Sequence, residues 1–121
     1  MHTRPGRRDV AFAVDADGLL VRTVTFPGGR AYRHRCSPAS YRAVARAVDE
    51  CPAGGGGGLV LELLARDLDL PFTQANVALE FLKERGVVVT RGRRNYPASG
   101  VAYEHAMCEF HALREETPGQ A

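Results

Sequence analysis

Long apolar runs are missing from this sequence of 121 residues. The longest, residues 58–65, is interrupted by Glu62 and is far shorter than the ~20 residues that a membrane-spanning helix needs. Residues 1–9 contain three arginines but lead into no apolar stretch of the kind found in signal peptides. We therefore expect no membrane partner, and a cytoplasmic location is the default expectation.

Cysteine is scarce, and the motifs of enzyme chemistry are missing. Cys36, Cys51 and Cys108 are widely spaced and form no C-x-x-C pair, so neither a disulfide framework nor a zinc ribbon is indicated. His105, Cys108 and His111 recur at intervals of three, but no carboxylate or second cysteine completes an obvious ligand set, so we expect no metal and no cofactor. With no nucleophile motif, paired acidic motif or dinucleotide fingerprint, we expect a protein that is not an enzyme.

The charges that are present fall into blocks. The net charge is only +2, yet residues 1–46 and 85–103 are strongly basic, whereas residues 47–84 and 104–121 are acidic. If folding brings the two basic blocks together, they form the positive face that a phosphate backbone requires. The alternative is that these arginines are simply solvated surface residues.

The first third of the chain predicts a small antiparallel sheet of three strands, with residues 1–9 as a flexible basic arm. Runs of apolar and β-branched residues separated by glycine-containing turns give strands at residues 10–14, 19–26 and 31–35. Because side chains alternate along a strand, Arg33 and Arg35 should share one solvent-facing row.

Helical patterns fill most of the remainder. Ser37 and Pro38 suit a helix start, and five consecutive glycines at residues 54–58 are typical of a flexible linker. The predicted elements are helices at residues 38–51, near 61–68, near 75–82 and at 100–116, strands at 87–90 and 95–97 joined by a turn, and a disordered tail at 117–121. The helices and strands within residues 37–99 are expected to form one domain, and the helix at 100–116 follows it.

The spacing of small and apolar residues in the two middle helices is typical of a helix-turn-helix. Ala65 is the small residue where the helices would cross, and Asp69 lies at the turn, where left-handed backbone geometry is needed. Leu70, Ala75 and Leu79 follow at the offsets that would lock the second helix against the first. The pattern predicts two short helices packed closely together.

The segment LELLARDLDLPFTQANVALEFLKERGVVVTRGRRNYP resembles the winged helix-turn-helix family. The resemblance implies an α+β fold, in which the helix ending in LKERG is the recognition helix and the hairpin after it is the wing. It covers about a third of the chain, or half if residues 38–51 are the opening helix. Two positions depart from the family pattern: Asp69 replaces the common turn glycine, and Pro71 and Phe72 stand where a polar cap is usual.

Nucleic-acid contacts are expected from the third helix and from the wing. The outward residues of the helix can bond to base edges or phosphates, although Glu80 and Glu84 make it less basic than many recognition helices. Arginines around the glycine turn of the wing can reach phosphates or a minor groove. The candidate contact residues are Thr73, Gln74, Asn76 and Lys83 on the helix and Arg91, Arg93, Arg94 and Tyr96 on the wing.

Two functions remain open at this level. The first is a transcriptional regulator that binds double-stranded DNA as a homodimer, paired through an apolar stripe on the C-terminal helix that includes Met107 and Phe110. That stripe could instead cover the core of a monomer. The second is a protein interaction module on a winged-helix scaffold, which is favoured if the wing, the third helix and Arg33 with Arg35 do not share one positive face.

Overall fold

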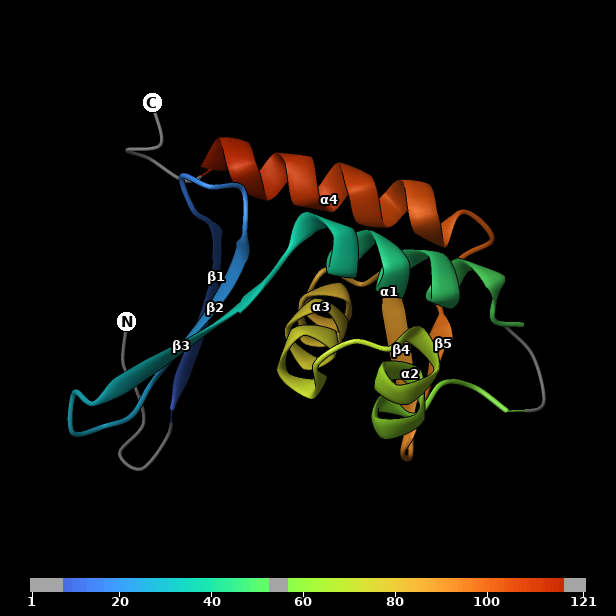
Figure 1. The fold of residues 1–121 in the computed structure, drawn as a ribbon, viewed down its shortest axis with the longest axis horizontal. Coiled ribbons are helices and arrows are strands. Elements are labelled where there is room, and N and C mark those ends of the chain that lie inside the picture. The colour runs from blue at the N-terminus through green and yellow to red at the C-terminus, as the bar shows by residue number, and fades with distance from the viewer. Residues whose placement is uncertain (1–7, 53–56, 117–121) are drawn as a thin grey trace.

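A computed structural model describes residues 8–52 and 57–116, and in them the expected α+β class is confirmed. The elements in chain order are β1 (Asp9–Val14), β2 (Leu20–Thr25), β3 (Ala31–Cys36), α1 (Pro38–Glu50), α2 (Leu61–Leu68), α3 (Phe72–Glu84), β4 (Val88–Arg91), β5 (Arg94–Pro97) and α4 (Ala102–Glu116). Figure 1 shows α4 lying along α1, with α3 between the three-stranded sheet on one side and α2 with the β4–β5 hairpin on the other. Helix α3 therefore has the three-stranded sheet as one neighbour and the hairpin with α2 as the other.

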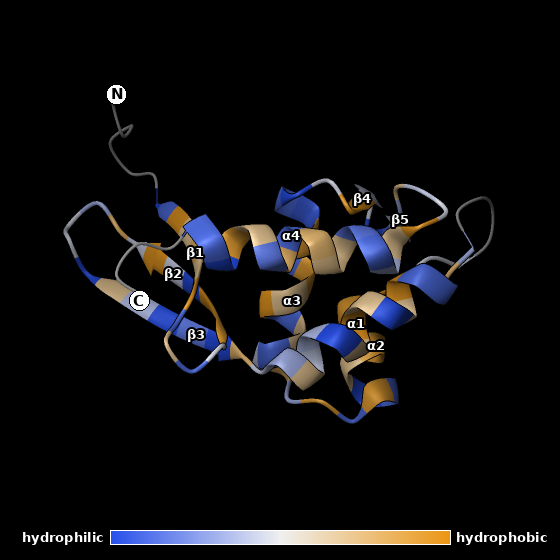
Figure 2. Ribbon diagram, turned by 90° about the horizontal axis from the view of Figure 1, so that it is seen from above, coloured by the Kyte–Doolittle hydropathy of each residue, from blue (hydrophilic) through white to orange (hydrophobic). Residues whose placement is uncertain are grey.

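The N-terminal sheet has the predicted antiparallel order β1-β2-β3. Its inner face is fixed by Phe12, whose ring centroid lies 5.3 Å from that of Phe81 on α3. Arg33 and Arg35 alternate onto the opposite face, and Figure 2 shows β3 mostly in the hydrophilic colour. The predicted arm is shorter than expected because Asp9 belongs to β1; residues 1–7 of that arm, like the predicted tail at 117–121, lie outside the described residues.

Helix α1 begins as the sequence predicts and supplies the centre of the core. Ser37 accepts a hydrogen bond from the Ser40 amide at 3.1 Å, and Pro38 occupies the first turn. Tyr41 is buried between Phe81 and Phe110, and its hydroxyl donates to the Ala106 carbonyl at 2.6 Å. Burial, and secondly the Glu109 carboxylate, raise the pKa of Tyr41 above its usual range, so this hydroxyl stays a donor.

The turn between α2 and α3 has the geometry predicted from its residues. Asp69 ends α2 with φ 56° and ψ 47°, the left-handed conformation that aspartate tolerates better than most residues. The following Leu70 amide donates to the Ala65 carbonyl at 2.9 Å, which closes the end of the helix. Ala65, Ala75 and Leu79 are all buried, as the spacing indicated.

The apolar stripe of helix α4 packs against the core of its own chain, which is the alternative that the sequence left open beside a dimer contact. The buried residues of the stripe are Ala102, Ala106, Phe110 and Leu113, and Met107 is partly buried beside them. Arg85, at the end of α3, forms ion pairs with two carboxylates of α4. Its Nη1 lies 2.9 Å from Glu109 Oε1, and its Nη2 lies 3.4 Å from Glu116 Oε1. The buried side of the stripe is therefore occupied by contacts within the chain. None of the described helices is long and apolar enough to cross a membrane.

The glycine run before α2 ends in a packed residue. Gly58 has φ +59°, and a Cβ added to it would lie 2.8 Å from Tyr96 Cζ and 2.9 Å from Arg94 Cβ. The next residue, Leu59, bridges to Asn95, with amide-to-carbonyl distances of 2.8 and 2.9 Å in the two directions. The expectation of a plain flexible linker is wrong for Gly58, while residues 54–56 lie outside the described part of the chain.

Candidate nucleic-acid interface

The β4–β5 hairpin is held in place by a buried asparagine. Asn95 accepts a hydrogen bond from the Thr90 hydroxyl at 2.7 Å, and its side-chain amide donates to the Leu59 carbonyl at 2.9 Å. Gly92 has φ +63°, which allows the tight turn at the tip. Side-chain and backbone bonds thus join the hairpin to the segment that leads into α2.

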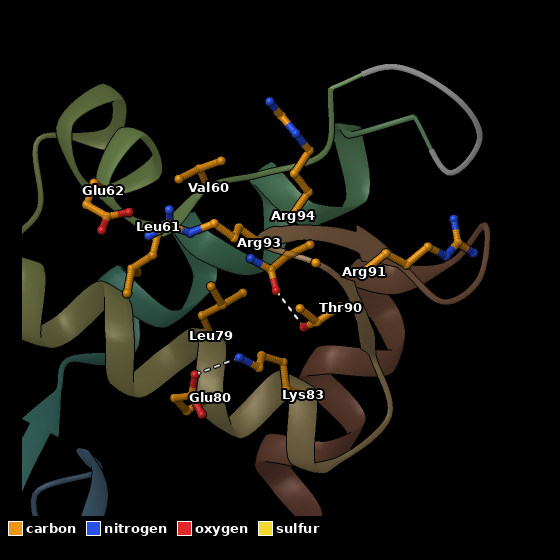
Figure 3. Close-up of a pocket in the computed structure, with 12 residues that line it drawn as sticks. Val60, Leu61, Glu62, Leu79, Glu80, Lys83, Thr90, Arg91, Arg93 and Arg94 are labelled. Atoms are coloured by element: carbon orange, nitrogen blue, oxygen red, sulfur yellow. Dashed lines mark hydrogen bonds and ion pairs between the residues drawn. The ribbon is translucent and has the colours of Figure 1, made fainter.

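A groove of about 650 Å³ lies between this hairpin, α3 and the start of α2 (Figure 3). Its lining residues are Val60, Leu61, Glu62, Leu79, Glu80, Lys83, Thr90, Arg91, Gly92, Arg93, Arg94 and Asn95. Cationic side chains outnumber the acidic ones among them. The wing and the third helix, predicted separately as contact surfaces, therefore form two walls of one groove.

The three arginines of the β4–β5 hairpin are exposed, but they are oriented differently. Arg91 lies over the Tyr96 ring, with its guanidinium carbon 5.2 Å from the ring centroid, and Arg94 donates to the Gly57 carbonyl. Arg93 has no hydrogen bond or ion pair with any residue in the described ranges. In Figure 3 Arg93 extends across the groove toward α2, whereas Arg91 and Arg94 point away from it.

On α3 the predicted contact residues are only partly at the groove. Lys83 lines it and forms an ion pair with Glu80, with Nζ 2.8 Å from Oε2, so one of the two acids predicted to oppose binding is already neutralised. Thr73 is exposed and Asn76 is half-buried, but neither lines the groove. The groove therefore adjoins the C-terminal half of the helix.

Two predicted contact residues are occupied within the fold. Gln74 does not point outward: it is half-buried, and its side-chain oxygen accepts a hydrogen bond from the Ser37 amide at 3.0 Å. Tyr96 is only 9% exposed, because its ring packs against the hairpin and the Gly58 segment. These side chains position the elements, and the contact surface is correspondingly smaller than predicted.

The basic surface next to α3 is not formed by the arginines that the sequence suggested. Arg33 and Arg35 lie on the sheet face away from α3, and Arg35 Nε is 3.5 Å from Asp15 Oδ2. The arginine on the inner face is Arg22, which sequence reasoning missed. Its position two residues from both Leu20 and Val24 on a predicted strand is the signal that could have shown it.

Within the described residues, the cysteines and histidines do not gather into a metal site. His105 Nε2 lies 3.5 Å from Glu109 Oε2, and the described ranges contain no cluster of three or more His, Cys, Asp or Glu residues able to hold a metal. Cys36 is fully buried, and burial raises the pKa of its thiol to about 12, which makes it a poor nucleophile.

Searches against family models, curated proteins and solved structures each returned no match. The function is accordingly inferred from the chain's own geometry.

Proposed function

We propose that the protein binds double-stranded DNA through a winged helix-turn-helix formed by α1, α2, α3 and the β4–β5 hairpin. The observation that supports it is the single groove lined both by the exposed arginines of the hairpin and by the C-terminal half of α3, with Arg93 extending across it. A protruding basic hairpin beside an exposed helix can contact backbone and groove together. The left-handed Asp69 turn, which sets α2 against α3, is compatible with this fold.

In this proposal the wing arginines hold phosphates and α3 lies in the major groove. Arg93, which extends across the groove without a partner among the described residues, is the first phosphate ligand. Lys83 and Asn76 would meet base edges or the adjacent backbone. The ion pair of Glu80 with Lys83 reduces the repulsion between that carboxylate and DNA.

A salt titration of binding to random-sequence duplex DNA, read by fluorescence anisotropy, tests the proposal. Each phosphate contact contributes about −0.9 to the slope of log affinity against log salt. Changing Arg91, Arg93 and Arg94 together to alanine should therefore make the slope shallower by about 3 and weaken binding at low salt.

The matched control removes the same number of positive charges elsewhere. Arg33, Arg42 and Arg114 are exposed and do not line the groove, so their triple alanine variant should keep nearly the wild-type slope. Equal losses in the two variants would mean that only net charge matters and would remove the wing from the site. Absence of any salt-dependent affinity in the wild type would refute DNA binding itself.

A protein interaction module remains the second candidate. Two observations favour it: Arg33 and Arg35 are turned away from α3, and the side chains of Leu63 and Phe72 are 47% and 51% exposed on either side of the α2–α3 turn. The same titration separates the two candidates. A protein interaction module is expected to show no affinity for DNA even at low salt, whereas a DNA-binding protein is expected to bind there.

A further inference from the structure

A second cleft, of about 360 Å³, lies on the other side of α3, between that helix and the inner face of the three-stranded sheet. Glu80 and Lys83 line both this cleft and the wing groove, so the outer ridge of α3 separates the two. The sheet side of the new cleft contributes two arginines, Arg8 and Arg22. Arginines thus flank α3 on both sides.

Arg22 is the unusual member of this cleft. It is only 7% exposed, and its Nε has no hydrogen-bond partner within residues 8–52 and 57–116. On the same face of the sheet its strand neighbours are Phe12 and His34, neither of which is a carboxylate. A buried donor without an acceptor is unfavourable, and Arg22 stands on a strand that otherwise buries leucine and valine, so the geometry favours an acceptor supplied by a ligand.

One of the two acidic residues of the cleft is closely paired with another cation. Glu80 Oε2 lies 2.8 Å from Lys83 Nζ, whereas Glu84 is half-exposed and its Oε2 lies 4.0 Å from Arg85 Nε, whose closer partners are Glu109 and Glu116. Neither carboxylate forms an ion pair with Arg22. The positive charge of Arg22 is therefore available to an external anion, in a place where desolvation strengthens the interaction.

We propose that Arg22, with Arg8 at the rim of the cleft, binds a backbone phosphate of the nucleic acid on the side of α3 opposite the wing. A helix inserted in the major groove, which is ~12 Å wide, has a phosphate backbone on each side. The wing contacts one backbone and the sheet contacts the other, so the N-terminal sheet becomes part of the binding surface. This inference rests on the proposed function for the source of the phosphate.

The test repeats the salt titration with single variants. Arg22→Gln should make the slope shallower by about 1 and weaken binding about tenfold, because one charge-assisted contact is lost. Arg8→Gln removes the charge of an exposed side chain outside the core, and it should also make the slope of log affinity against log salt shallower. Arg33→Gln, on the opposite face of the same sheet, is the matched control and should bind as the wild type does.

The outcomes separate this inference from the proposed function. If the wing variants weaken binding while Arg22→Gln and Arg8→Gln both match Arg33→Gln, the second phosphate contact is refuted and DNA binding stands. If the wild type does not bind DNA, both proposals fall.

The NMR resonance of the Arg22 Nε–H group identifies the source of the anion. It should shift when duplex DNA is added at constant ionic strength. A shift with inorganic phosphate alone and none with DNA would assign the cleft to a small phosphate ligand, which overturns the inference.

Discussion

Replacing Gly58 by alanine should destabilise the whole protein. The residue adopts φ +59°, which costs an L-residue about 1–2 kcal/mol. The new methyl would also lie 2.8 Å from the ring of Tyr96, which is buried and has little freedom to move. Forcing a methyl into such a place typically costs about 1–3 kcal/mol, offset in part by about 0.4–1 kcal/mol from the stiffer unfolded chain. The net loss is about 1–4.5 kcal/mol.

The measurement is urea unfolding of Gly58→Ala beside Gly57→Ala, followed by circular dichroism. Gly57 is the matched control, because a Cβ there would meet nothing within 4 Å. The midpoint should fall for Gly58→Ala alone, with an unchanged m-value if both variants unfold from the same compact state. Stabilities of the two variants within about 0.5 kcal/mol of each other would show that the close approach of Gly58 to Tyr96 is not as described.

Three further changes should alter the stability in a predictable direction. Burial raises the pKa of the Cys36 thiol to about 12 in the folded protein, whereas the pKa of an unfolded cysteine is about 8.5. The unfolded state therefore loses this proton first, and the free energy of unfolding should fall by about 2 kcal/mol from pH 8 to pH 10. Cys36→Ala should lack most of this loss, and an equal slope in both proteins would assign it elsewhere. Asp69→Gly should raise stability by about 0.5–1 kcal/mol in thermal melts, since glycine adopts the left-handed turn without strain, and a lower melting temperature would contradict this. Arg22→Met should raise the free energy of unfolding by about 1–2 kcal/mol and weaken the proposed DNA binding, because it removes a buried donor that has no acceptor among the described residues. A loss of stability would reveal a partner that Arg22 has within the fold.

Elements set by local chemistry were predictable from the sequence. Ser37 caps α1, Asp69 turns left-handed after α2, and the strand and helix periods locate the sheet and the core helices. Each depends on neighbours a few residues away, so a single sequence contains the information.

Features set by packing between distant segments were predicted poorly. Gln74 lies on the polar side of α3, yet the proximity of Ser37 turns it into a structural acceptor. Periodicity identifies the stripe of α4 but does not distinguish the core of its own chain from a second copy. The sequence does not predict a role for Arg22, because it is a single charge in an otherwise apolar strand. Only the packing of the sheet against α3 places it in a cleft.

The bridge between Leu59 and Asn95 has a consequence for local opening of the protein. The Leu59 amide is bonded to Asn95 across a separation of more than thirty residues, and the Asn95 side chain holds the same Leu59 carbonyl. If the hairpin lifts away while Leu59 stays with α2, the hydrogen bond donated by the Leu59 amide must break as well. In hydrogen-exchange experiments this amide, which precedes α2 in the chain, should exchange together with the amides of the hairpin, and the proposed DNA binding should slow all of them together.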